Sequence, residues 1–179
     1  VGITFIHVTH NQEEALTVAD RIAIIADGDL VEQGTARDIY ETPQTRFTAG
    51  FIGDNNLLDG KVSDTNEKYL TVDLGYTKVN VPALSSRSNL GQEVSFSIRS
   101  ELLSLIESDD FNGDGWQVIP ATLLETIYLG LTTSYLVRLA DNSEVVVRKI
   151  SSGENHSKIE SGQNIKVGWQ TDHARLHIN

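Results

Sequence analysis

The hydrophobic pattern at the start of the chain predicts a buried strand that leads into a helix. Residues 3–8 are mostly apolar and partly β-branched, which is typical of a strand covered on both faces. Asn11 follows, and Glu14 lies three residues further on, as in the capping box that begins many helices. His10 stands between the two elements. Because open α/β sheets bind ligands at the carboxyl ends of their strands, His10 is the first candidate for a functional residue.

Short helices and one hairpin are predicted as far as residue 56. Apolar residues at helical spacing predict a helix over residues 12–20. Thr35, with Asp38 three residues on, predicts the start of a second helix. The proline that follows Thr42 ends this helix, because a residue before proline avoids the helical conformation. The other expected elements are strands at 21–26 and 30–34, joined by an Asp-Gly turn, and a helix at 44–52.

A polar break at residues 54–56 separates these elements from a different pattern. After it, short runs alternate between apolar and polar residues, which indicates half-buried strands. Many short strands at close spacing are typical of an all-β barrel or sandwich. We therefore divide the chain into a first domain at residues 1–56 and a second at residues 57–179. The expected strands lie at residues 70–74, 78–81, 94–98, 122–128, 134–139, 144–149, 165–169 and 174–178.

The second domain contains an internal similarity. Residues 91–98 align with residues 162–169, and at the same spacing Leu105 meets Leu176. Two copies of one group of strands predict either a pair of small barrels or one barrel that is completed by strands from both copies. The alternative is that alternating strands resemble one another without any duplication.

The composition is that of a folded protein, with 39% hydrophobic and 22% charged residues. The net charge of −11 argues against a nucleic-acid partner, because such proteins neutralise phosphates with lysine and arginine. The absence of cysteine excludes disulfides and thiolate metal sites. No apolar run approaches the roughly 18 residues of a membrane span, so we expect a cytoplasmic protein without direct membrane insertion. The chain lacks methionine and begins in an expected strand, so we expect Val1 to be a cut end.

Several strings of residues match the pattern of one family. They are Val8-Thr9-His10-Asn11-Gln12-Glu13-Glu14-Ala15-Leu16, Gln33-Gly34-Thr35, Phe47-Thr48-Ala49-Gly50-Phe51-Ile52-Gly53, Ser97-Ile98-Arg99-Ser100-Glu101 and Glu125-Thr126-Ile127-Tyr128-Leu129-Gly130. In them the chain resembles the C-terminal portion of the ATP-binding subunit of ABC importers, in the branch that carries a TOBE domain. The resemblance implies an α+β fragment of a P-loop ATPase domain at residues 1–56, followed by an all-β, OB-like TOBE barrel with internal duplication at residues 57–179.

Two residues depart from the family pattern. Asn11 stands where the family usually has aspartate, which keeps a capping side chain but removes one charge. Ser100 replaces the usual proline, which loosens a turn without touching any chemistry.

The resemblance implies that His10 is the switch histidine, whose imidazole reaches the γ-phosphate of ATP and the attacking water. Phosphoryl transfer depends on positioning and electrostatic stabilisation, which an imidazole fixed at a strand end can supply. A histidine at a strand end is by itself an ordinary residue, so the surrounding string carries this interpretation. His7 is expected to be a strand residue without a catalytic role.

The motifs that bind ATP are missing from this sequence. It has no Gly-x-x-x-x-Gly-Lys-Ser/Thr phosphate loop, no acidic strand for magnesium with its catalytic glutamate, and no Ser-Gly-Gly-Gln signature. ATP and Mg are therefore the cofactors implied for the intact ATPase, and neither a cofactor nor a metal is expected in this chain alone. We expect the chain by itself neither to bind nor to hydrolyse ATP.

The function that the resemblance implies for the intact protein is ATP-driven import. The Tyr-Leu-Gly and Ile-Arg-x-Glu segments most resemble the spermidine/putrescine type, whereas ferric-ion and sugar importers share much of the pattern. The implied partners are a second ATPase subunit in a homodimer and two membrane-spanning permease subunits, with the ATPase peripheral on the cytoplasmic face of the membrane. The second domain is then regulatory or a dimerisation domain. The alternative is a stand-alone ligand-sensing or dimerisation β module without ATPase activity.

Residues 110–115 resemble the opening of a calcium loop. Asp110, Asn112 and Asp114 supply oxygen atoms at alternate positions, and Gly115 is the sixth residue. The twelfth position is Ala121 where a calcium loop has a bidentate glutamate. Since aspartate, asparagine and glycine are also the usual residues of turns, an ordinary loop is the alternative that we favour.

Two other groups of side chains suggest binding in the second domain. Four aromatic residues could form a base-stacking platform on an OB-type barrel, but the net negative charge favours packing in the core or an interface. These are Trp116, Trp169, Tyr128 and Tyr135. Three arginines on expected strands are candidates for holding a small anion, although alternating arginines also occur on solvated strand faces. These are Arg99, Arg138 and Arg148.

Overall fold

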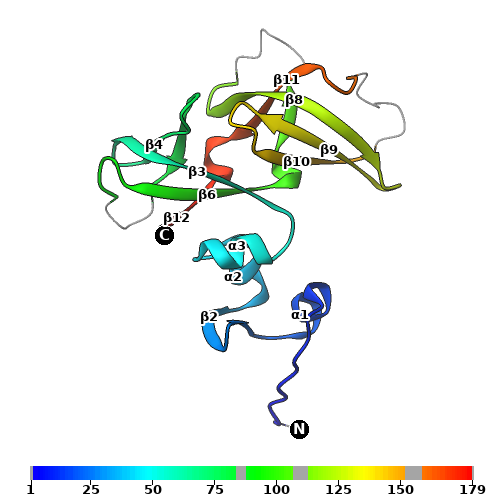
Figure 1. The fold of residues 1–179 in the computed structure, drawn as a ribbon. Helices are drawn as coiled ribbons and strands as arrows, with labels where there is room; N and C mark the ends of the chain where they lie inside the picture. The colour runs from blue at the N-terminus through cyan, green and yellow to red at the C-terminus, as the bar shows by residue number, and fades with distance from the viewer. Residues whose placement is uncertain (1, 84–87, 107–112, 152–158, 179) are drawn as a thin grey trace.

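The computed structural model describes residues 2–83, 88–106, 113–151 and 159–178 (Figure 1). Three short helices and a hairpin lie on one side of two β-sheets. Among the helices that the structure describes, none has the length and apolar character that a membrane span needs. The elements are α1 (Gln12–Val18), β1 (Ile22–Ala26), β2 (Asp29–Gly34), α2 (Ala36–Glu41), α3 (Arg46–Phe51), β3 (Asn55–Thr65), β4 (Tyr69–Asp73), β5 (Lys78–Pro82), β6 (Glu93–Arg99), η1 (Ser100–Leu102), β7 (Ser104–Ile106), β8 (Trp116–Tyr128), β9 (Thr132–Leu139), β10 (Glu144–Ile150), β11 (Asn164–Gln170), η2 (Thr171–His173) and β12 (Arg175–Ile178).

Residues 12–53, called here the N-terminal unit, fold around a small apolar core of their own. The hairpin of β1 and β2 turns through Asp27 and Gly28, which have φ angles of 52° and 90°. Two consecutive positive φ angles are what a tight two-residue hairpin turn requires. The helices and the hairpin enclose four buried isoleucines. These are Ile22, Ile24, Ile39 and Ile52.

The helices α1 and α2 begin where the capping residues predict. The side chain of Asn11 accepts a hydrogen bond from the backbone N–H of Glu14 at 3.2 Å. Thr35 and Asp38 make both hydrogen bonds of a capping box, at 3.2 and 3.0 Å. Such caps satisfy N–H groups that the first turn of a helix leaves without a partner.

The predicted strand at residues 3–8 is wrong. These residues have no regular structure and extend away from the other elements (Figure 1), and Phe5, Ile6 and Val8 are 86%, 91% and 90% exposed. The run is apolar enough for a central strand, but a strand needs neighbours that satisfy its N–H and C=O groups. None of the described strands pairs with it. His7 is consequently not a strand residue, and the described N-terminal residues contain no parallel sheet.

The described residues from 54 to 178, called here the β unit, form two five-stranded antiparallel sheets. The first has the strand order β12-β6-β3-β4-β5, and the second has the order β10-β9-β8-β11-β7. The expected all-β architecture is therefore confirmed. The sequence pattern missed β3 and β7, which lie in the first and second sheets, respectively.

The internal duplication is visible in matching details of the two sheets. The backbone N–H groups of Val62 on β3 and Leu123 on β8 donate to the carbonyl oxygens of Gln92 and Gln163, each at 3.0 Å. A break in the pairing register follows each of these residues, so β3 and β8 carry a bulge at the same place. Each copy ends with a strand, a 3-10 turn and a short strand, which are β6, η1 and β7 in the first copy and β11, η2 and β12 in the second.

The last strand of each copy is exchanged with the other copy. β7 ends the first copy but pairs with β11 of the second sheet, and β12 ends the second copy but pairs with β6 of the first sheet. Figure 1 shows β12 beside β6. The molecule thus has two sheets, each completed by a strand of the other copy.

One continuous apolar core fills the β unit. Trp169 is fully buried, and its ring lies 6.4 Å from that of Phe96, centroid to centroid. Tyr135 is also buried, so core packing is confirmed for these two members of the aromatic group. Tyr128 is 63% exposed near the end of the β8–β9 hairpin, so it does not belong to the core, and its packing in an interface stays a prediction.

Candidate functional site

His10 lies at the surface, directly before the cap of α1. The nearby carboxylate of Glu14 accepts a hydrogen bond from the Thr9 hydroxyl at 2.6 Å and lies 3.3 Å from Nε2 of His7. The hydrogen bonds from Thr9 and His7 lower the pKa of Glu14, and the charges of His7 and His10 act in the same direction. The imidazole of His10 itself is open to solvent.

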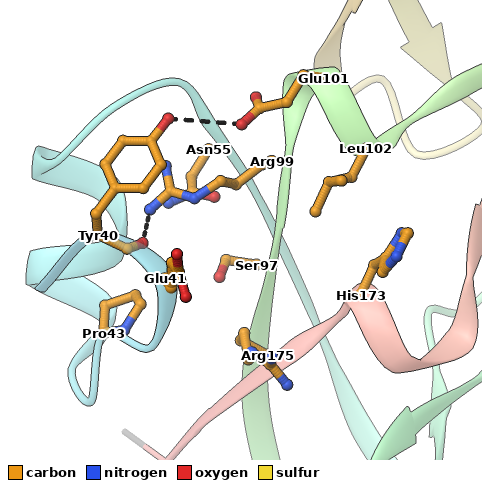
Figure 2. A pocket seen from close by; sticks show the side chains of 10 residues that line it. All are labelled: Tyr40, Glu41, Pro43, Asn55, Ser97, Arg99, Glu101, Leu102, His173 and Arg175. Atoms are coloured by element: carbon orange, nitrogen blue, oxygen red, sulfur yellow. Dashed lines mark hydrogen bonds between the residues drawn. The ribbon is translucent and has the colours of Figure 1, made fainter. Parts of the chain in front are cut away.

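A cleft of about 290 Å³ lies where the N-terminal unit meets the β unit (Figure 2). We call it the junction cleft. Its walls come from the end of α2 on one side and from β3, β6, η1, η2 and β12 on the other. Its lining residues are Tyr40, Glu41, Pro43, Asn55, Ser97, Arg99, Glu101, Leu102, His173 and Arg175.

Arg99 on β6 contacts Tyr40 of α2 and so connects this helix to the β unit. Its guanidinium donates to the carbonyl oxygen of Tyr40 and lies 3.5 Å from the centroid of the Tyr40 ring (Figure 2). The Tyr40 hydroxyl in turn donates to Glu101 at 3.5 Å. Burial lowers the pKa of Arg99, while Tyr40 and Glu101 act in the opposite direction. The group keeps its charge, because arginine is not deprotonated in proteins.

A second arginine crosses the same boundary from the opposite direction. Arg46 on α3 pairs with both carboxylate oxygens of Asp59 on β3, and it donates to the hydroxyl of Ser95 on β6 at 2.5 Å. Ser95 also donates to Asp59 at 2.6 Å. Together with the contacts of Arg99, this network joins the N-terminal unit and the β unit into a single connected structure.

The three arginines that the sequence suggests for an anion all have protein partners. Arg99 is engaged with Tyr40 as described above. Arg148 pairs with the carboxylate of Asp54, and Arg138 lies 3.9 Å from the carboxylate of Glu144. Arg99 and Arg138 line different cavities, whereas Arg99 and Arg148 both interact with the carboxylate of Asp54.

The junction cleft carries charges of both signs. Figure 2 shows Glu41 on the side of α2, and His173 and Arg175 on the side of the β unit. Nδ1 of His173 is buried and has no hydrogen-bond partner within the described residues. The hydroxyl of Ser97, one of the lining residues, lies 2.9 Å from Nε2 of the fully buried His177, and the charged side chains of the lining suit contact with a polar ligand.

The calcium interpretation lies largely outside the described residues. Residues 110–112 of the loop 110–115 are not described, and nothing further follows for that loop. In the ranges that the structure does describe, no group of three or more histidine, aspartate or glutamate side chains is placed to hold a metal ion.

Sequence reasoning missed the partners that give the junction its form. The resemblance singled out Arg99 and Glu101, but it did not connect them with Tyr40, which is about sixty residues away in the sequence. Arg46 was missed because nothing in its local sequence separates an arginine bound to Asp59 from an exposed one. One local feature could have pointed to the junction. Arg99 and Glu101 lie two residues apart at the end of a buried strand.

Comparison with known proteins identifies relatives over nearly the whole chain. The spermidine/putrescine import ATP-binding protein PotA of Thermobifida fusca is 37% identical over 177 residues, which cover 97% of this chain and 44% of that protein. The protein of the same name from Pseudomonas fluorescens is 39% identical over 180 residues, which cover 99% of this chain and 46% of that protein. The chain thus spans less than half the length of these relatives.

A solved structure shares the fold of a large part of this chain. It is the cytoplasmic molybdate-binding protein ModG in a molybdate-bound crystal form, with a TM-score of 0.63 and 13% sequence identity. The match covers 72% of this chain and 99% of that chain. At this identity the likeness shows an OB-like fold alone.

The family model of the TOBE domain matches residues 83–176, which begin after β5 and reach β12. This range holds all five strands of the second sheet, but of the first sheet only β6 and the start of β12. It covers β8, β9, β10 and β11 of the second copy, whereas β3, β4 and β5 of the first copy precede it. The chain therefore belongs to the TOBE domain family and corresponds to the C-terminal region of spermidine/putrescine import ATP-binding proteins.

Proposed function

We propose that this chain is the C-terminal portion of the ATP-hydrolysing subunit of an ABC importer for polyamines. The observation that carries the proposal is the alignment of 97% and 99% of the chain with import ATP-binding proteins whose names specify spermidine and putrescine. Residues 1–56 then belong to the nucleotide-binding domain, and residues 57–179 form a regulatory or dimerisation domain. ATP and Mg are bound mainly by other regions of the longer protein.

Within this proposal, His10 is the residue that contacts the γ-phosphate. Its imidazole is exposed at the start of α1, where a nucleotide held by the rest of the subunit can approach it. A neutral imidazole both donates and accepts hydrogen bonds, so it can orient the attacking water and stabilise charge on the transferred phosphoryl group. The partners are a second copy of the ATPase subunit and two membrane-spanning permease subunits, on the cytoplasmic face of the membrane.

Uptake by the complete transporter tests this function. Cells that lack their own polyamine importers are supplied with the full-length subunit and its permease and binding-protein genes, and uptake of labelled spermidine is measured. We expect uptake that His10→Ala abolishes and that His7→Ala, a matched histidine in the same segment, leaves in place. Uptake of labelled ferric ion or of a sugar, without spermidine uptake, would contradict the proposed substrate.

A second candidate function is binding of a small anion by the β unit. It is favoured by a cavity of about 620 Å³ beside β8, β9 and β11, whose lining includes Arg138 and Lys166. Thermal unfolding of the 179-residue chain with oxyanions and with polyamines tests this candidate. A rise in melting temperature with an oxyanion that Arg138→Gln abolishes would support it, and unchanged melting with every oxyanion would count against it.

A further inference from the structure

The side chain of Gln12 ties the start of α1 to the segment that leads into the β unit. Its Nε2 donates to the carbonyl oxygen of Phe51 at 2.5 Å, and its Oε1 accepts from the backbone N–H of Gly53 at 2.9 Å. The donor and the acceptor of one planar amide therefore both bond to the same short segment, residues 51–53. Gln12 is the first residue of α1 and lies two positions after His10.

The β unit holds this segment from the other side. Arg99 on β6 places Nη1 3.5 Å from the carbonyl oxygen of Ile52, between the two residues that Gln12 contacts. Gly53 has a φ angle of +72°, and a Cβ atom at this position would lie 2.6 Å from Nη1 of Arg99. Residues 51–53 are therefore a common support for α1 and β6.

Apolar packing does not hold the first turn of α1 in place. Ala15, Leu16 and Ala19 pack against the core of the N-terminal unit, but they belong to the middle and the end of the helical segment. Gln12 is one turn earlier, next to His10. Its paired hydrogen bonds fix both the position and the orientation of this first turn, because a planar amide with two partners has one favourable geometry.

We propose that Gln12 is a positioning residue for His10, an inference that rests on the proposed function. Through residues 51–53, Gln12 makes the location of His10 depend on how the N-terminal unit docks on the β unit. Positioning residues remote from the reacting atoms can change rates strongly, since a displacement of about 1 Å can cost as much as about 100-fold in rate. A signal at the β unit can reach His10 through this contact without any new ligand contact at the nucleotide.

The contact itself is tested in the 179-residue chain, by hydrogen exchange at the backbone amide of Gly53. Gln12→Leu removes both hydrogen bonds, so exchange should become about tenfold faster. Gln12→Glu keeps an acceptor for Gly53 and should retain most of the protection. The matched control is Gln44→Leu, which removes a side-chain amide that donates to the carbonyl oxygen of Thr42 at 2.8 Å. Equal exchange rates in Gln12→Leu and Gln44→Leu would overturn the inference.

The effect on catalysis is tested in the full-length subunit assembled with its permeases. ATP hydrolysis is expressed per bound ATP, so that a smaller folded fraction does not imitate a slower reaction. We expect Gln12→Leu to lower kcat about tenfold with KM for ATP unchanged, because both ends of the Gln12 amide are bonded within the chain and Gln12 acts through His10. Gln12→Glu should restore some of the lost kcat, and Gln44→Leu should leave it unchanged.

Failures of the inference and of the proposed function give different results. If His10→Ala abolishes hydrolysis while Gln12→Leu and Gln44→Leu have equal kcat, the role of Gln12 is overturned and the proposed function stands. If His10→Ala leaves kcat unchanged, the proposed role of His10 fails and the inference falls with it. If Gln12→Leu does not fold, as judged by circular dichroism, a kcat of Gln12→Glu equal to that of the unmodified protein overturns the inference.

Discussion

Arg99 contacts Tyr40 in two ways at once, by stacking 3.5 Å from the centroid of the ring and by donating to the carbonyl oxygen of the same residue. Arg99 belongs to the β unit and Tyr40 to the N-terminal unit. A planar guanidinium can combine these contacts because it stacks through its face and donates hydrogen bonds along its edge. One side chain of the β unit therefore contacts both the ring and the backbone of Tyr40.

Replacing Arg99 should weaken the whole structure. Arg99→Leu is expected to lower the free energy of unfolding by about 2–3 kcal/mol, because it removes a desolvated cation–π contact and leaves a carbonyl oxygen without its donor. Arg99→Lys should recover only a fraction of this loss. Urea titration of each variant measures its free energy of unfolding. The control is Arg37→Leu, which removes an exposed pair with Glu41 and should cost about 0.5 kcal/mol or less. Equal losses for Arg99→Leu and Arg37→Leu would contradict the docking role.

Alanine substitutions at two glycines distinguish the cost of backbone strain from the cost of crowding at the junction. Gly53 and Gly75 both have positive φ angles, of +72° and +87°. A Cβ atom on Gly75 meets nothing within 4 Å, whereas one on Gly53 meets Arg99 and Tyr40. Gly75→Ala should therefore cost about 1 kcal/mol from strain alone, and Gly53→Ala at least about 1 kcal/mol more. Thermal unfolding of both variants measures the difference, and equal melting temperatures would count against a crowded junction.

The buried His177 should make the junction sensitive to acid. It is fully buried on β12, with Nε2 2.9 Å from the hydroxyl of Ser97 on β6. Burial lowers the pKa of His177, although the backbone of Gln44 and the carboxylate of Glu32 oppose this, and the charge of Arg46 adds to it.

The direction of the pH effect follows from that lowered pKa. The unfolded chain takes up a proton near pH 6.5, whereas the folded chain resists protonation until a lower pH. Stability contributed by neutral His177 is therefore present above pH 6.5 and is lost as the pH falls through the pKa of the folded state. Urea titrations at pH 8 and pH 5 should show a smaller loss in His177→Gln than in the unmodified chain. Equal losses would show that His177 has no role in the acid response.

Two aromatic residues should differ sharply in their contribution to stability. Trp169 is fully buried in the core of the β unit, so Trp169→Ala should cost about 3–5 kcal/mol. Tyr128 is mostly exposed, so Tyr128→Ala should cost about 0.5 kcal/mol or less. Denaturant titration compares the two variants. A large loss for Tyr128→Ala would mean that this side chain is covered in solution, for example by a second copy of the chain.

The 179-residue chain should not bind nucleotide on its own. It carries His10 but no phosphate-binding loop, and most of the affinity for a nucleoside triphosphate comes from such a loop and from its magnesium ligands. Titration calorimetry with Mg-ATP should detect no heat of binding. Micromolar affinity at a single site would contradict this prediction, and loss of that affinity in His10→Ala would locate the site.

Local sequence signals predicted the caps, the hairpin and most strands because the interactions that determine them are local. β3 escaped because it contains many polar residues, one of which is buried for a nonlocal reason. The side chain of Asn56 accepts from the N–H of Val146 at 2.7 Å and donates to its carbonyl oxygen at 2.8 Å. A polar side chain can be buried when a distant backbone satisfies it, and no spacing rule along one strand reveals that partner.

The candidate site was only partly predictable, for the same reason. The string around His10 could be found from sequence, because all of its residues are neighbours in the chain. The predicted strand at residues 3–8 was wrong because an apolar pattern shows only that a run could form a buried strand. Whether a neighbouring strand is present to pair with it depends on the rest of the fold. The junction of Arg99 with Tyr40 is a contact between distant segments of the chain, which only the folded structure brings together.

The exchange of β7 and β12 sets the order of events during synthesis. The first sheet contains β3, β4, β5 and β6, yet its outer strand is synthesised only after β8, β9, β10 and β11 of the second sheet. Until β12 emerges from the ribosome, the edge of β6 has unpaired N–H and C=O groups, which are prone to pairing with other chains. The newly made chain therefore exposes that edge while the second sheet is being made, and a premature stop just before β12 would leave it open permanently.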